Sequence, residues 1–148
     1  MEIRGTDDEF VVLTPILGSF PDDPLQVLDC SCAMGSHRFA GATFPGDPTI
    51  RIEKEALIRF VDEVRVLERE RHGEAAFECP QLQLVIYVAD RAGHIDLRAM
   101  LIDIQSEGIH QVAIEFGVDP TALPGILADL EALLAVPDLD RPLAESSF

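Results

Sequence analysis

Hydrophobic residues recur along this chain with two different periods. Over residues 82–89 apolar side chains occupy every second position, as at Leu82 and Leu84, and this period is typical of a β-strand. Over residues 53–72 the apolar spacing changes to three and four, as at Leu57, Phe60 and Val64, which predicts an amphipathic helix. The chain is therefore predicted to combine strands with helices.

Further strand-like runs lie on both sides of this helix. They are rich in Val, Ile, Leu and Phe and are bounded by turn-forming residues. The predicted strands are residues 9–17, 25–34, 38–44, 76–79, 82–89, 95–104 and 111–118, with residues 49–52 as a brief extended approach to the helix. Tight turns are expected at 35–37, 90–93 and 106–108, and such short links favour antiparallel neighbours.

A second helix is predicted over residues 121–135. Asp119 and Thr121 are both candidate N-caps, and Pro124 favours Thr121 because proline is tolerated only in the first turn. Gly73 is expected to stop the first helix, and Pro137 the second. Residues 138–148 are expected to form a frayed tail.

These elements give the order β-β-β-α-β-β-β-β-α and predict an α+β fold, a largely antiparallel sheet packed by two helices. At 148 residues the chain is expected to form one domain, residues 1–148, without an internal repeat. The side chains expected to be buried by the two helices are Leu57, Phe60, Val64, Leu127 and Leu130.

The net charge of the chain limits the kinds of partner that it is expected to bind. The chain has 27 Asp and Glu against 11 Lys and Arg, a net charge of −16. Residues 1–29 carry seven acids and one arginine, and residues 90–148 carry eleven acids and three arginines, whereas residues 53–71 are nearly balanced. This distribution disfavours nucleic acid and anionic membranes as ligands. It favours a protein partner with a basic surface, although solubility alone is the simpler explanation.

Cysteine usage and hydropathy indicate a cytoplasmic protein. Cys30, Cys32 and Cys79 are expected to be reduced thiols, because Cys30 and Cys32 lie two apart in one strand, where a disulfide is unfavourable. A zinc site would need a second close pair of ligands, which Cys79 does not supply. No apolar run approaches the roughly 20 residues of a membrane-spanning helix, and the first residues lack a signal-peptide pattern.

Candidate catalytic residues form no familiar motif. His37, His94 and His110 fall at predicted turns, and whether they converge is open; a chance distribution is favoured over a metal or acid–base site. No serine lies in a Gly-x-Ser-x-Gly elbow. We therefore expect a protein that is not an enzyme and needs no metal or cofactor, with a small carboxylate and histidine enzyme as the least favoured alternative.

Several local patterns follow one another in a familiar order along most of the chain. They are Gly18-Ser19-Phe20-Pro21-Asp22-Asp23, Phe39-Ala40-Gly41, Glu55-Ala56-Leu57 with Phe60, Gly73-Glu74-Ala75-Ala76-Phe77, the Gly93 hairpin, Gln111-Val112-Ala113-Ile114-Glu115-Phe116 and the helix after Asp119. In content and order these segments resemble the WapI-type immunity proteins of bacterial toxin systems. One departure is Cys30 after Leu28-Asp29, where an aromatic residue is expected.

The resemblance implies a bacterial cytoplasmic protein that binds and neutralises a partner toxin, often a nuclease, without catalysis. A basic nuclease surface would complement the charge of −16. The alternative is an acidic ligand-binding or adaptor module unrelated to toxins. Acids in predicted turns or element ends stay accessible, so the candidate partner-binding residues are Asp22, Asp23, Asp90, Glu107 and Asp119.

Overall fold

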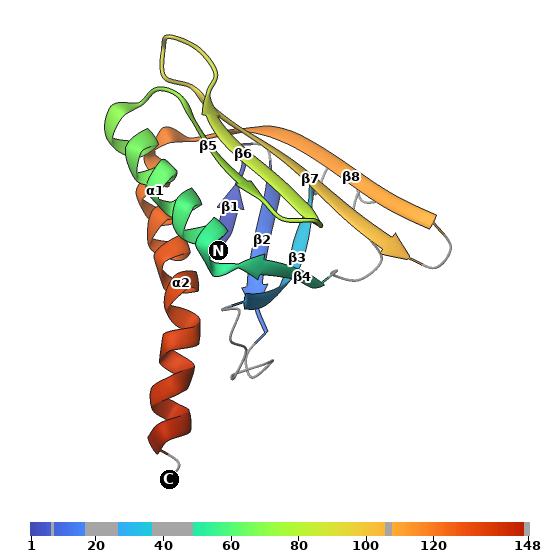
Figure 1. Ribbon diagram of the computed structural model, residues 1–148. Helices are drawn as coiled ribbons and strands as arrows, with labels where there is room; N and C mark the ends of the chain where they lie inside the picture. The colour runs from blue at the N-terminus through green and yellow to red at the C-terminus, as the bar shows by residue number, and fades with distance from the viewer. Residues whose placement is uncertain (7, 17–26, 37–48, 106–107, 147–148) are drawn as a thin grey trace.

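The period-two segments form two separate antiparallel sheets in the computed structural model, which describes residues 1–6, 8–16, 27–36, 49–105 and 108–146. Each sheet is a meander of four strands followed by a helix (Figure 1). The elements are β1 (Glu2–Arg4), β2 (Glu9–Pro15), β3 (Val27–Ser36), β4 (Thr49–Glu53), α1 (Lys54–Glu70), β5 (Glu74–Glu78), β6 (Leu82–Val88), β7 (Ile95–Gln105), β8 (Gly108–Val118), the 3-10 turn η1 (Pro120–Ala122) and α2 (Leu123–Ser146).

The predicted α+β class and the predicted order of strands and helices are confirmed. The structure adds the short strand β1, and the extended segment before the first helix is strand β4, which pairs with β3. The tight turn expected at 35–37 is wrong in its first two positions. Gly35 and Ser36 continue β3, because they pair with Phe10 and Glu9 of β2. The strand predicted at 38–44 lies outside the described residues.

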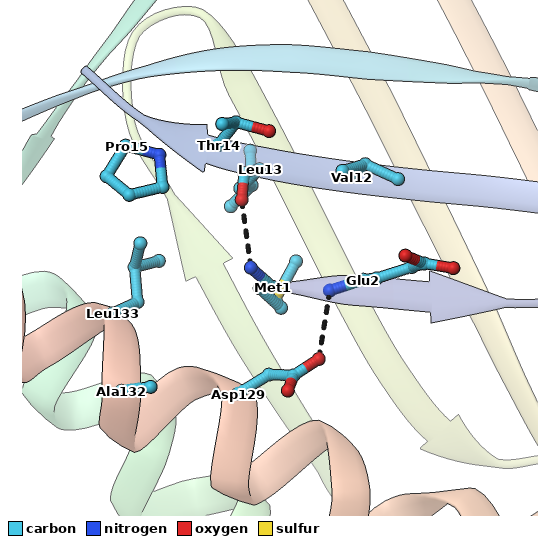
Figure 2. Close-up of a pocket in the computed structure, with 9 residues that line it drawn as sticks. All are labelled: Met1, Glu2, Val12, Leu13, Thr14, Pro15, Asp129, Ala132 and Leu133. Carbon is cyan, nitrogen blue, oxygen red and sulfur yellow. Dashed lines mark hydrogen bonds between the residues drawn. The ribbon is translucent and has the colours of Figure 1, made fainter.

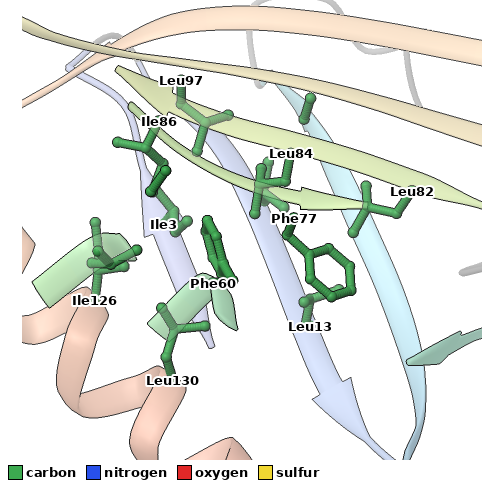
Figure 3. Packing of buried hydrophobic residues seen from close by; sticks show 14 of the residues in the cluster. Ile3, Leu13, Phe60, Phe77, Leu82, Leu84, Ile86, Leu97, Ile126 and Leu130 are labelled. Atoms are coloured by element: carbon green, nitrogen blue, oxygen red, sulfur yellow. The ribbon is translucent and has the colours of Figure 1, made fainter. Parts of the chain in front are cut away.

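Buried side chains from both sheets and both helices belong to one hydrophobic cluster. Alternate positions supply it, such as Ile3 in β1, Leu13 in β2, and Leu84 in β6 (Figure 3). The link between β1 and β2 also touches the second sheet directly, since the N–H of Thr6 donates to the carbonyl of Gly117 in β8 at 3.1 Å. The core therefore lies where the two sheets and the helices come together.

Helix α1 buries the predicted stripe. Leu57, Phe60 and Val64 are all buried, and the ring of Phe60 lies 5.9 Å from that of Phe77 in β5, tilted by 59° (Figure 3). The helix ends earlier than predicted. Arg71, with φ 57°, is its left-handed C-cap and its N–H donates to Leu67 O, while Gly73 turns the chain into β5.

Helix α2 begins and ends differently from the prediction. Asp119 is the N-cap of the 3-10 turn η1, and Thr121 lies within that turn. Because η1 leads into α2 at Leu123, Pro124 falls in the first turn of the helix. Helical backbone continues through Pro137 to Ser146, beyond the expected end, and this part of α2 projects past the sheets (Figure 1). Proline has no backbone N–H and therefore removes one hydrogen bond from a helix. This loss weakens the helix without necessarily ending it. Leu130 is buried and Leu127 half-buried.

The three cysteines are thiols and not disulfides. Cys30 and Cys32 lie on the buried face of β3, as their spacing predicted, and Cys79 is half-buried after β5. Burial raises the pKa of the Cys30 thiol to about 12 and also raises the pKa of Cys79. The thiols of these two cysteines are therefore held in their neutral form.

Candidate functional site

The two acidic segments of the sequence meet in the tertiary structure. Strands β1 and β2 belong to residues 1–29, and α2 belongs to residues 90–148. The backbone N–H of Glu2 donates to Oδ2 of Asp129 at 3.2 Å, although 127 positions separate the two residues (Figure 2). This contact places acids from both segments on one side of the molecule.

A hollow of about 360 Å³ lies at this junction, and we call it the terminal hollow. Leu13 and Leu133 face it from β2 and α2 (Figure 2). The amino group of Met1 donates to Leu13 O at 2.9 Å, and the N–H of Leu13 donates to Met1 O at 2.8 Å, so paired backbone forms one wall. The lining residues are Met1, Glu2, Val12, Leu13, Thr14, Pro15, Asp129, Ala132 and Leu133.

The terminal hollow is mostly apolar, and the charged groups that line it are the carboxylates of Glu2 and Asp129 and the amino group of Met1. Both Glu2 and Asp129 are exposed, and Glu2 also forms an ion pair with Arg4. Such a surface can contact a side chain that combines an apolar stem with a positively charged end. Glu2 and Asp129 are not among the predicted contact residues, because those are acids in turns or at element ends, whereas Glu2 lies in a strand and Asp129 in a helix.

Asp90, a predicted contact residue, organises the turn between β6 and β7. Its carboxylate accepts from the N–H groups of Ala92 at 2.9 Å and His94 at 3.2 Å, and its Oδ2 lies 2.6 Å from Nδ1 of His94. The hydrogen bond with His94 lowers the pKa of Asp90 and raises the pKa of His94. Asp90 is exposed, as predicted, and it also holds its own turn.

Asp119 is also exposed, and its carboxylate also accepts hydrogen bonds within its own turn. Its Oδ1 accepts from the N–H of Thr121 at 2.9 Å and from the hydroxyl of that residue at 2.8 Å, and these bonds lower the pKa of Asp119. Asp90 and Asp119 lie at the same end of the second sheet, because Ile95 at the start of β7 pairs with Val118 at the end of β8. The other candidates, Asp22, Asp23 and Glu107, lie outside the described residues.

Two of the turn histidines are far apart. His94 immediately precedes β7, whereas His110 in β8 pairs with Asp103 near the other end of that strand. The eight positions from Ile95 to Asp103 span roughly 26 Å at about 3.3 Å each, so the two histidines lie near opposite ends of β7. His37 lies outside the described residues. Within the described part of the chain, no three His, Cys, Asp or Glu side chains are grouped so as to hold a metal ion.

Several arginines are engaged by the protein's own carboxylates. Arg51 donates to Asp29 at 3.1 Å, and Asp29 is the buried charged residue among those described, with 9% of its surface exposed. Arg65 lies 2.9 Å from both Asp62 and Glu131. Both arginines stay about half-exposed, and each ion pair cancels one acid against one base, so the net charge of −16 comes from the acids that outnumber the bases.

Neither a protein-family model nor a curated protein sequence matches this chain. One solved structure that resembles it is that of Trypanosoma brucei MRP1/MRP2, with 9% identity, coverage of 86% of this chain and 83% of that chain, and a TM-score of 0.40. At this TM-score the likeness supports no conclusion about fold or function. Among the described residues, no helix is both long and apolar enough to cross a membrane.

Proposed function

We propose that this protein binds and neutralises a toxin with a basic surface, in the manner of WapI-type immunity proteins, in the cytoplasm of a bacterium. The observation that supports this most is the contact between Glu2 and Asp129, which joins the two acidic segments. The toxin proposed is a nuclease, since a surface that binds phosphates is rich in Lys and Arg. The protein acts by occupying that surface, without a catalytic step.

Electrostatic steering follows from this arrangement. Charges on one side of a molecule add their fields, so a basic partner is drawn to that side before contact. Steering is screened over a Debye length of about 8 Å at physiological ionic strength. Association should therefore slow markedly from low to high salt, while dissociation changes less.

Co-expression with a toxin encoded beside this gene tests the proposal. The wild-type chain should restore growth, and purified protein should bind the toxin domain with salt-dependent association. The double variant Glu2→Gln/Asp129→Asn removes two charges at the terminal hollow and should slow association. The matched control Glu78→Gln/Glu115→Gln removes two exposed charges from the second sheet and should slow it less.

The five predicted contact residues, which are acids in turns or at element ends, are tested in the same co-expression assay. Asn or Gln replacements of Asp22, Asp23, Asp90, Glu107 and Asp119 remove five charges, and Asn at Asp90 and Asp119 retains an oxygen to accept the turn hydrogen bonds. Full protection by this variant, with association independent of salt, would refute the electrostatic mechanism. Failure of the wild-type chain to bind or protect would refute the toxin role and favour the adaptor alternative.

A further inference from the structure

The outer face of α1 carries apolar side chains that the core does not use. Ile58 is 45% exposed and Val66 is 40% exposed, and they account for two of the three exposed large hydrophobic side chains among the described residues. They lie eight positions apart, with Asp62 midway between them, so all three share one side of the helix. Paired exposed apolar residues on one helix face are typical of a contact surface.

A hollow of about 360 Å³ opens beside this face, between α1 and the start of β5, and we call it the α1–β5 groove. Val66 and Leu67 line it, and its surface is mostly apolar. Carboxylates surround this apolar lining from both the helix and the strand. Among the described residues, the groove is lined by Arg59, Asp62, Glu63, Val66, Leu67, Glu70, His72, Gly73 and Glu74.

The groove is acidic although the helix as a whole is nearly balanced. Four carboxylates and one arginine line it, which gives a formal charge of −3 with His72 neutral. Arg65 donates to Asp62 of the groove and to Glu131 of α2, both at 2.9 Å, and Arg71 donates to the carbonyls of Glu68 at 2.8 Å and Pro120 at 3.4 Å. Neither of these cations lines the groove. Glu74 adds a carboxylate from β5.

We propose that the α1–β5 groove receives an arginine or lysine side chain from a basic segment of the partner protein, with apolar neighbours of that side chain packing on Ile58. The aliphatic stem of such a side chain fits Val66, and its charge meets the carboxylates of Glu70 and Glu74. The proposal rests on the proposed function, because it supplies a second contact surface for the same basic partner.

The internal partners of Glu70 hold it only weakly. Glu70 lies 3.6 Å from both Arg69 and His72, and all three side chains are substantially exposed. Exposed ion pairs at that distance hold their members weakly. The guanidinium of a partner arginine can therefore displace Arg69 or His72 from Glu70. Arginine is favoured over lysine because it can make a bidentate contact to a carboxylate.

A short peptide tests the groove without any toxin. The probe is the capped hexapeptide Leu-Arg-Leu-Ser-Arg-Leu, and its control has citrulline, which is uncharged, in place of each arginine. Titration into isotopically labelled protein, followed by amide NMR shifts, gives both the affinity and the site. We expect shifts confined to residues 58–74 and about tenfold weaker binding of the citrulline peptide.

Variants then separate this site from general charge attraction. Glu70→Gln/Glu74→Gln should weaken binding of the arginine peptide about tenfold, and Val66→Ser about threefold. Glu78→Gln/Glu115→Gln removes the same number of charges outside the groove, at the far end of β5 and in β8, and should weaken binding less than about twofold. Equal losses in the two double variants, or shifts centred away from α1 and β5, would overturn the proposal. The toxin role is judged by co-expression and does not depend on this peptide.

Discussion

Arg65 on α1 joins the two helices of the fold by donating to Glu131 on α2 at 2.9 Å, across 66 positions of sequence. The same guanidinium donates to Asp62 one turn earlier on its own helix, also at 2.9 Å. The hydrogen bond with Glu131 is the main reason that the pKa of Arg65 is raised. Arg65 and Glu131 are about half-exposed, at 50% and 48%, so the pair adds little to the stability of the fold.

We expect a salt-dependent coupling between Arg65 and Glu131. Replacing Arg65 by Met, Glu131 by Gln, and both together forms a double-mutant cycle measured by urea unfolding. The coupling should be small and should shrink when salt is raised, because exposed charges are screened. A large coupling that salt leaves unchanged would show that the pair is shielded from water.

Removing the Phe60 ring should destabilise the fold strongly. The side chain is 1% exposed and contacts the ring of Phe77, so Phe60→Ala should lower the free energy of unfolding by about 3–5 kcal/mol. Ile58→Ala, on the exposed side of the same helix, should change it by less than about 0.5 kcal/mol. A loss below about 1 kcal/mol at Phe60 would contradict its burial.

Two glycines should respond in opposite directions to alanine. A Cβ at Gly5 would lie 2.6 Å from the ring of Phe116, so Gly5→Ala should destabilise the junction between the sheets. A Cβ at Gly125 would meet nothing within 4 Å, and alanine is the better helix former there, so Gly125→Ala should raise stability by up to about 1 kcal/mol. Thermal melts of both variants would show the contrast, and stabilisation by Gly5→Ala would refute the close approach.

The Asp90–His94 pair should be visible as a shifted titration. The carboxylate raises the pKa of His94 above its ordinary 6.5, and the imidazole lowers the pKa of Asp90 below its ordinary 3.8. The pair therefore stabilises the turn fully between about pH 3.8 and pH 6.5. Its contribution is lost as pH rises through the raised pKa of His94 or falls through the lowered pKa of Asp90.

NMR titration of the His94 ring measures this directly. Asp90→Asn should return the pKa of His94 toward its ordinary value, because the main cause of the shift is removed. Asp119→Asn makes the same change of charge at another turn and should have little effect. Equal responses to the two substitutions would point to the overall charge of the protein and not to the contact.

Cys30 should resist thiol reagents in the folded protein. Its pKa of about 12 leaves almost no thiolate at pH 8, and the side chain is fully buried. Iodoacetamide labelling followed by mass spectrometry should find Cys79, which is only half-buried, modified before Cys30. Urea should make both cysteines reactive, and rapid labelling of native Cys30 would contradict its burial.

Local periodicity explains which elements were predictable. The long runs in β6 and α1 contain several apolar residues at one spacing, so their type follows from the sequence. Strand β1 was missed because it has three residues and one core side chain, Ile3, which is too short for a period. It forms because the edge of β2 is available for pairing and the core accepts Ile3.

Turn chemistry explains part of the candidate site. The sequence correctly placed Asp90 and Asp119 at exposed turns or element ends, since their side chains satisfy nearby backbone N–H groups. It did not predict that Glu2 and Asp129 meet, because no local pattern records which distant element docks beside a strand. The second hollow was missed for the same reason, since it needs both α1 and β5.

By itself, the sequence determined the α+β class, the order of the elements, the buried faces of α1 and β6, and the two acidic segments. The tertiary structure decided that these elements form two sheets, that the acidic segments touch at Glu2 and Asp129, and that Arg65 turns away to Glu131. Periodicity is a property of neighbours in the chain, whereas the partner of a charged side chain depends on how apolar faces from remote elements dock. The net charge of this protein therefore follows from its sequence, but the positions of the charged residues on the surface depend on the fold.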